Sequence, residues 1–286
     1  MQVTRFNNST EYYQRVESYL LQNEATNCLL LGIAKSLCSY QSGDRDRPYL
    51  VTLENNQSIL ATAIQTPPRR LLLAKSTGIE AVKLIAKNIT LENKSLPGVI
   101  GLKSEAEIFA RTWQSIAGKA FKLAIAMKIH QLETVQPITF ASGRLRLAQE
   151  SDRRLLLKWI KAFELEALGD NEVKSDYQLW FESNIQAQSL FVWQDKEPVS
   201  MTTFGGATPN GIRINGVYTP QEFRGKGYAT SCVAAVSQQL LKRGYQYCFL
   251  FTDLANPSSN HIYRKIGYKS VGEISNYAFE SREINK

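Results

Sequence analysis

The stretch that decides the fold of the second half of the chain is Ile214–Thr230, which reads INGVYTPQEFRGKGYAT. A strand-like run passes into a short loop, after which apolar residues recur with the period of a helix. Gly225 and Gly227 let backbone N–H groups approach an anion without obstruction from Cβ atoms. The helix N-terminus adds unpaired donors and partial positive charge, while Arg224 and Lys226 add formal charge. The stretch therefore predicts a pyrophosphate site between a strand and a helix.

Two other nucleotide-binding motifs do not match this loop. A Walker loop requires GxxxxGK[ST], which the sequence lacks. A Rossmann fingerprint requires G-x-G-x-x-G/A, but after Gly225 and Gly227 the next small residue, Ala229, comes one position too early. The nearest carboxylate for a ribose, Asp253, is also poorly placed. These mismatches argue against a nicotinamide or flavin nucleotide.

A second motif lies downstream at 256–268 and reads NPSSNHIYRKIGY. Together the two motifs resemble the signatures of the GNAT superfamily of N-acetyltransferases. Arg224-x-x-Gly227-x-Ala229 is similar to the acetyl-CoA motif R/Q-x-x-G-x-G/A of that family. The stretch at 256–268 is similar to the N-x-x-A/S-x-x-x-Y-x-K-x-G-F/Y segment of the family. As in the family, one expected helix and one expected strand lie between the two motifs. The resemblance covers residues 140–286.

The resemblance implies an α/β fold in which a mixed, mostly antiparallel sheet is flanked by helices. The sequence pattern agrees, because hairpin-like strands come first and strands alternate with helices later. In the second half we expect strands at 144–148, 190–194, 199–205, 212–219, 247–252, 268–271 and 274–279. The expected helices of this half lie at 151–168, 175–184, 227–243 and 257–266.

The first half lacks both motifs, yet its strands followed by a helix faintly resemble the other half. We expect strands at 28–32, 49–54, 59–65 and 70–74, and helices at 10–22, 77–91 and 104–117. The resemblance implies a degenerate GNAT-like domain, as in tandem members whose C-terminal copy alone binds CoA. Turn formers between 134 and 143 follow a helical pattern, so the predicted domains are residues 1–136 and 140–286.

The resemblance also assigns roles to matching positions, with acetyl-CoA as the co-substrate. The backbone of Val217, Tyr218 and Thr219 would pair with the pantetheine amides, and Asn256 would hydrogen-bond the same arm. The pyrophosphate would lie beside Arg224. The pyrophosphate oxygens would accept hydrogen bonds from the backbone N–H groups of Gly225, Lys226, Gly227, Tyr228, Ala229 and Thr230.

Tyr263 would lie near the thioester sulfur, where its chemistry is suitable. An amine attacks the thioester carbonyl and the CoA thiolate leaves. Since a thiol has a pKa of about 8.5 and a tyrosine about 10, Tyr263 can act as the general acid. The general base has no motif, because the strand at 247–252 holds no carboxylate. Glu166 is our candidate and Glu164 its neighbour, although either could lie on a solvated helix face.

Composition narrows the function classes. The chain of 286 residues has only two histidines, and its four cysteines form no CxxC pair, so we expect no metal site and no Ser-His-Asp or Cys-His mechanism. The polar N-terminus does not resemble a signal peptide, and the longest aliphatic stretch, about 28–34, is too short to span a bilayer. We therefore expect a cytoplasmic protein without a membrane partner.

Three functions remain at this point. The first is transfer of an acetyl group from acetyl-CoA to a small-molecule amine or a peptide amino group. The second is a catalytically inactive CoA-binding regulatory protein, suggested by the missing strand carboxylate. The third is nucleic-acid binding, suggested by the net charge of +8, although lysines and arginines are scattered rather than massed. The sequence does not identify the acceptor, whose specificity we place in the helices at 151–168 and 175–184 and the region 170–185, nor the oligomeric state.

Overall fold

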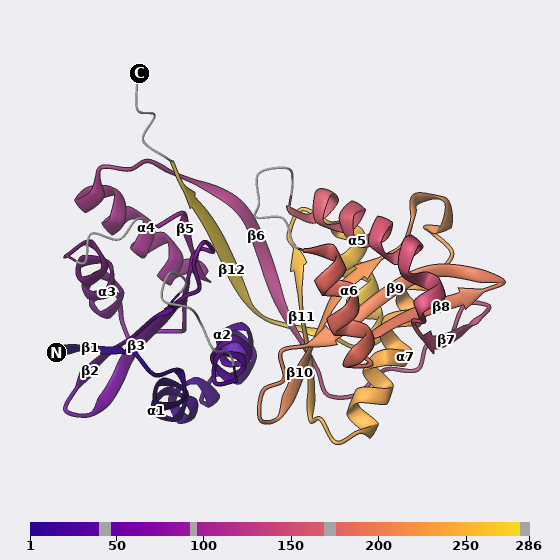
Figure 1. Cartoon of the computed structure of the whole chain (residues 1–286), viewed down its shortest axis with the longest axis horizontal. Helices are drawn as coiled ribbons and strands as arrows, with labels where there is room; N and C mark the ends of the chain where they lie inside the picture. The colour runs from indigo at the N-terminus through magenta and orange to yellow at the C-terminus, as the bar shows by residue number, and fades with distance from the viewer. Residues whose placement is uncertain (40–46, 92–95, 169–175, 281–286) are drawn as a thin grey trace. The chain divides into compact units, whose positions relative to one another are not determined.

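The computed structural model describes residues 1–39, 47–91, 96–168 and 176–280 (Figure 1). The chain divides into two compact units. The first unit consists of Met1–Ile129 together with the segment that begins at Val271, and the second consists of His130–Ser270. The chain therefore passes into the second unit once and returns to the first before it ends.

The two halves of the sequence share one order of elements: a strand, two helices, three strands, a helix, a strand, a helix and a strand, apart from short 3-10 turns. The first half comprises β1 (Gln2–Phe6), α1 (Ser9–Leu21), α2 (Glu24–Leu37), β2 (Tyr49–Asn55), β3 (Ser58–Gln65), β4 (Leu71–Leu73), α3 (Ile79–Leu91), β5 (Gly98–Leu102), α4 (Lys103–Ala117) and β6 (Phe121–Leu132). The second half comprises β7 (Arg144–Leu147), α5 (Arg153–Leu168), α6 (Tyr177–Gln186), β8 (Leu190–Asp195), β9 (Glu197–Gly205), β10 (Gly211–Tyr218), α7 (Tyr228–Lys242), β11 (Tyr247–Asp253), α8 (Pro257–Ile266) and β12 (Lys269–Phe279).

In the first unit the strands follow the order β1-β2-β3-β4-β5-β12. Neighbouring strands are antiparallel except for the parallel pair β4 and β5. Side chains of β2 alternate between the two faces of the sheet, as the strand period requires. Tyr49, Val51 and Leu53 pack under α3 and α4, whereas Leu50 and Ile64 pack under α1 and α2. Helices therefore cover both faces of this sheet.

In the second unit the order is β11-β10-β9-β8-β7, and only β10 and β11 run parallel. Ile212 and Ile214 of β10 pack against α7 and α8. Val192 and Met201 of the neighbouring strands pack against α5 and α6, which lie in front of the strands in Figure 1. The predicted α/β fold, with a mostly antiparallel sheet flanked by helices, is confirmed.

The first half differs from the prediction in four elements. The apolar run at 28–32 lies inside the buried helix α2 and not in a strand, because a short apolar run looks alike in a buried strand and a buried helix. β6 occupies part of the region with a helical pattern, and neither β1 nor β5 was predicted. β1 and β6 carry weak alternation, since many of their residues are only half-buried.

The compact units differ from the predicted division into 1–136 and 140–286 in how the last strands are placed. β12 is one strand and not two, and it pairs antiparallel with β5, with Ile274 opposite Leu102 and Ala278 opposite Gly98. Conversely, Leu132 at the end of β6 packs in the core of the second unit. The last strand of each half thus contributes to the other unit. The sequence pattern of a strand does not reveal this, because it shows which face is buried but not which strand lies beside it.

Candidate active site

The predicted pyrophosphate loop lies between β10 and α7. Gln221–Phe223 forms a 3-10 turn, and α7 begins at Tyr228. Gly225 and Gly227 have φ angles of 78° and 81° in the left-handed region. A Cβ atom at Gly225 would meet no atom within 4 Å, so the backbone conformation and not the space requires glycine there.

The backbone donors at the α7 end of this loop have no hydrogen-bond partner among the described residues. No side chain caps the N-terminus of α7, whose N-cap is Gly227. Among the hydrogen bonds of the described residues, none uses the backbone N–H groups of residues 225–230. Lys226 is exposed beside them. A cluster of free N–H groups at a helix N-terminus is a binding site for an anion such as a pyrophosphate.

The strands part next to this loop. β10 and β11 pair only from Gly211 to Arg213 on β10, opposite Tyr247 to Phe249 on β11. On the other side of β10, its register with β9 shifts between Asn215 and Tyr218. A bulge of this kind bends a strand and leaves backbone groups unpaired. The predicted pantetheine contacts at Val217, Tyr218 and Thr219 fall on this part of the chain.

Arg224 is held by a carboxylate and a backbone carbonyl. Its Nη2 lies 2.7 Å and 3.1 Å from the two carboxylate oxygens of Glu166, and its Nε donates to the carbonyl of Thr219 at 2.8 Å. Burial, with the Glu166 carboxylate nearby, raises the pKa of Tyr218. The structure therefore brings together a predicted residue of the first motif and the candidate base, which belongs to no motif, and it leaves Glu166 ion-paired rather than alone.

Tyr263 lies on α8 and is 7% exposed. Its ring centroid lies 5.9 Å from that of Tyr268 and 6.3 Å from that of His130. Burial raises its pKa well above the ordinary value. Within the described part of the chain its hydroxyl has no hydrogen-bond partner. Tyr263 therefore keeps its proton at neutral pH, as a proton donor must, and it also packs as a core aromatic residue.

Asn256 is the N-cap of α8. Its side-chain oxygen accepts from the backbone N–H of Ser259 at 3.0 Å, and Pro257 follows at the first helical position. Both features are favourable at a helix start. The capping bond uses the amide oxygen, so the amide nitrogen is the group that remains for a pantetheine carbonyl.

Tyr228 has a contact that sequence reasoning did not predict. Its hydroxyl donates to the carboxylate of Asp195 at 2.6 Å, and Ser142 donates to the same oxygen at 2.7 Å. These two bonds hold the pKa of Asp195 below its ordinary value. They tie the start of α7 to the end of β8, and they connect residues too far apart in sequence for a motif to show.

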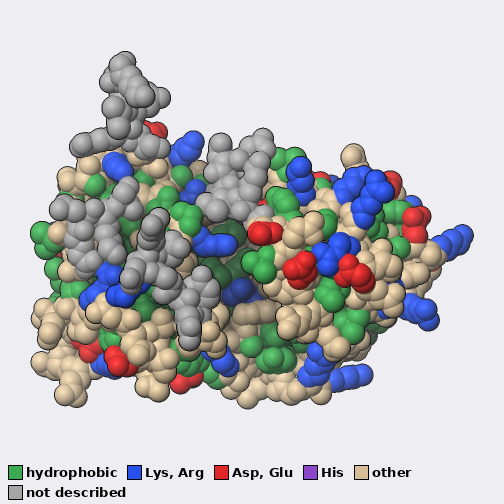
Figure 2. Space-filling model, viewed as in Figure 1, with side chains coloured by type: hydrophobic (Ala, Val, Ile, Leu, Met, Phe, Trp, Pro, Cys, Tyr) green, Lys and Arg blue, Asp and Glu red, His purple; other side chains and the backbone are tan. Residues whose placement is uncertain are grey.

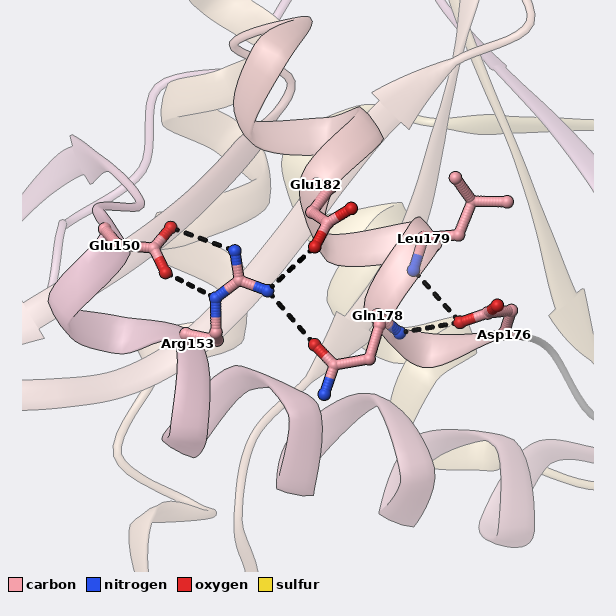
Figure 3. A network of polar contacts seen from close by, with 6 residues as sticks. All are labelled: Glu150, Arg153, Asp176, Gln178, Leu179 and Glu182. Carbon is pink, nitrogen blue, oxygen red and sulfur yellow. Dashed lines mark hydrogen bonds and ion pairs between the residues drawn. The ribbon is translucent and has the colours of Figure 1, made fainter.

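The two helices that we expect to face the acceptor are linked by the polar network of Figure 3. Arg153 of α5 bonds Glu150, and its Nη1 lies 3.0 Å from Gln178 and 3.2 Å from Glu182 of α6. Asp176 caps α6 by accepting from two backbone N–H groups at 3.0 Å. Of the predicted specificity region 170–185, residues 170–175 lie outside the described residues.

Two further findings concern the described residues as a whole. Nowhere in them do three or more His, Cys, Asp or Glu side chains gather as a metal ion would require. None of their helices has the length and apolar character needed to cross a membrane.

Comparison with known proteins agrees with the motifs. Residues 154–268 match the model of the acetyltransferase (GNAT) family, and no curated protein matches the sequence. A GNAT-family acetyltransferase from Colwellia psychrerythraea superposes with a TM-score of 0.62 at 12% identity, covering 98% of this chain and 100% of that one. A Drosophila protein superposes with a TM-score of 0.70 at 11% identity, covering 97% and 98%.

A tandem GNAT protein from the clavulanic acid biosynthesis pathway is also similar, with a TM-score of 0.55 at 10% identity and coverage of 98% of each chain. Identities this low show a shared fold and nothing more. The motifs at 224–229 and 256–268 lie inside the region that the family model matches, and the fold neighbours extend over almost the whole chain. Residues 154–268 are therefore a domain of the acetyltransferase (GNAT) family, in a chain that has the fold of GNAT proteins throughout.

Proposed function

We propose that the protein transfers an acetyl group from acetyl-CoA to a primary amine. The observation that carries this proposal is the set of partnerless N–H groups at residues 225–230 of the described chain, at the start of α7 and beside the parted ends of β10 and β11. Pyrophosphate on these groups would direct the pantetheine arm along Val217–Thr219. The thioester would then lie toward α8, which carries Tyr263.

The reaction needs no covalent enzyme intermediate. The neutral amine attacks the thioester carbonyl, a C–N bond forms, and the tetrahedral intermediate collapses as the C–S bond breaks. Tyr263 donates its proton to the departing sulfur, and the former amine gives up a proton to a base. Burial makes Tyr263 a weaker acid, but the same desolvated surroundings raise the pKa of the leaving thiol, so transfer can accompany C–S cleavage.

Glu166 is the base that we propose. Its carboxylate must first leave the ion pair with Arg224. Both side chains of this pair are about half exposed. An exposed pair of this kind is worth only about 0–1 kcal/mol, so its opening is not costly. The acceptor in this proposal is a small-molecule amine or a peptide amino group, and cysteines without disulfide bonds in the described residues suit a reducing cytoplasm.

The positive net charge does not favour nucleic acid as the partner. Figure 2 shows basic side chains dispersed over the face in view, with acidic side chains among them. A nucleic-acid site would instead gather Lys and Arg in a stripe with stacking aromatic residues.

The test is release of free CoA from acetyl-CoA over a panel of amines, with wild type and Tyr263→Phe compared. Loss of a general acid costs roughly a hundredfold or more in turnover, while binding of acetyl-CoA should persist. Binding without release over the panel would favour the inactive regulatory protein. Failure to bind acetyl-CoA would contradict the proposal altogether.

A further inference from the structure

A chain of buried polar groups joins β6, β11 and α8. His130, near the end of β6, is 5% exposed, and Thr252 of β11 is 3% exposed. The Nε2 atom of His130 lies 3.1 Å from the Thr252 hydroxyl oxygen. The same hydroxyl lies 2.8 Å from the Oδ1 atom of Asn260 on α8. All of these contacts lie within the second unit.

The direction of each hydrogen bond follows from its neighbours. The Nδ2 atom of Asn260 donates to the backbone carbonyls of Asp253 at 3.1 Å and Asn256 at 2.8 Å. Its oxygen therefore faces Thr252 and receives the single hydroxyl proton. The hydroxyl oxygen must then accept, so the Nε2 atom of His130 carries a proton. The Nε2–H group of His130 is thus the donor at the buried end of this polar chain.

The two carbonyls at the far end belong to the last residue of β11 and to the N-cap of α8, at the two ends of the loop between these elements. Asn256 in this loop caps α8, and Tyr263 follows Asn260 by one helical turn on the same side of the helix. The ring of His130 also lies near the ring of Tyr263, with 6.3 Å between centroids. The polar chain therefore braces the start of α8 at the point where β11 has parted from β10.

We propose that His130 is a positioning residue for the acyl end of acetyl-CoA. Acting through Thr252 and Asn260, it holds the loop and α8 where Asn256 and Tyr263 meet the pantetheine arm and the thioester. This inference rests on the proposed function. It extends the site to β6, a strand of the first half of the sequence, in which no motif had been found.

The test uses matched variants of the full-length protein and two ligands, acetyl-CoA and ADP, with affinities measured by calorimetry. ADP has the adenosine and the pyrophosphate but lacks the pantetheine arm. Thr252→Val removes both hydrogen bonds at constant shape, and Thr252→Ser keeps them. His130→Leu removes the donor, and His130→Gln places an amide N–H near the position of Nε2.

We expect Thr252→Val and His130→Leu to weaken acetyl-CoA binding roughly threefold to tenfold, the effect of one or two lost hydrogen bonds, while ADP binding stays the same. Thr252→Ser and His130→Gln should bind both ligands as wild type does. Ser237→Ala, which removes the buried bond to Tyr268 at 2.9 Å, controls for lost stability and should not separate the two ligands.

Equal weakening of both ligands would mean a general structural role and would overturn the inference, as would unchanged acetyl-CoA binding. If His130→Leu does not fold, His130→Asn, whose amide N–H falls short of Thr252, must give the same selective loss. Wild-type protein that binds no acetyl-CoA would instead refute the proposed function. The two failures are therefore distinguishable.

Discussion

The loop between β4 and α3 and the loop between β10 and α7 hold the same place in the shared order of elements, but their backbone donors differ in what they meet. In the first half, the N–H of Lys75 donates to the side chain of Asn27 at 3.0 Å, and the N–H of Ser76 donates to the carboxylate of Glu105 at 3.2 Å. Asn27 and Glu105 are both buried. In the second half, the N–H groups of residues 225–230 have no partner within the described residues.

The difference is that a carboxylate of the protein itself already bonds the first loop. The carboxylate of Glu105 accepts from the N–H and the hydroxyl of Ser76, just before α3 begins. Since two anions at one site repel each other, we expect no pyrophosphate there. The second loop, with Gly225 and Gly227 in left-handed conformations, keeps its donors for a ligand.

The largest expected effect tests which unit the last strand serves. Phe279 stacks on Trp113 with 5.9 Å between centroids, inside the core of the first unit. Phe279→Ala should lower the free energy of unfolding by about 3–5 kcal/mol. Hydrogen exchange should show lost protection in α3 and α4 before α7. Loss that begins in α7 would contradict the assignment of β12 to the first unit.

The next effect tests whether the second loop is the binding one. Gly227→Val forces a β-branched residue into the left-handed region, at a cost of about 1–3 kcal/mol. Acetyl-CoA affinity should therefore fall roughly tenfold or more in calorimetry. Gly78→Val is the control in the first half, where a Cβ atom meets nothing within 4 Å and the backbone is not left-handed, and it should leave affinity unchanged. An equal loss from both changes would remove the contrast between the loops.

A smaller effect is expected when the first loop loses its internal anion. Glu105→Ala leaves the N–H of Ser76 without its partner and should destabilise the first unit by about 1–3 kcal/mol. Chemical denaturation checks the loss. Acetyl-CoA affinity should stay at the wild-type value, because the second loop is intact; a change in affinity would show that the two loops are not independent.

The smallest expected effect on stability concerns the ion pair beside the second loop. Glu166→Gln breaks the ion pair with Arg224. Because both side chains are about half exposed, the free energy of unfolding should change by about 1 kcal/mol or less. CoA release should nevertheless fall if Glu166 is the base, with acetyl-CoA affinity retained. If CoA release is not diminished, the general base is a group other than Glu166.

Much of the second half could be predicted from the sequence because its signals are local. The glycines at 225 and 227, the apolar period of α7 and the cap at Asn256 each act within one turn of their own position. The first half was harder. The run at 28–32 is apolar throughout, which does not separate a strand from the buried helix α2, and β6 has little alternation.

The site was predictable only where a motif listed its residues. The motif positions were placed on the loop and on α8 as expected, but their partners came from far along the chain. Glu166 lies 58 residues from Arg224, and Glu105 lies 29 residues from Ser76. His130 lies 122 residues from Thr252 and belongs to neither motif. No spacing rule could have indicated these pairs.

By itself, the sequence determined the kind of loop and the helix that follows it, because backbone conformation and periodicity depend on neighbouring residues. It also determined which residues are available for the proposed chemistry. Tertiary structure alone decided that β12 pairs with β5, that Glu105 bonds Ser76 in the first loop, and that Arg224 meets Glu166. The physical reason is that strand pairing and buried polar contacts depend on which distant segments the core brings together, and a strand or a carboxylate carries no local mark of its partner.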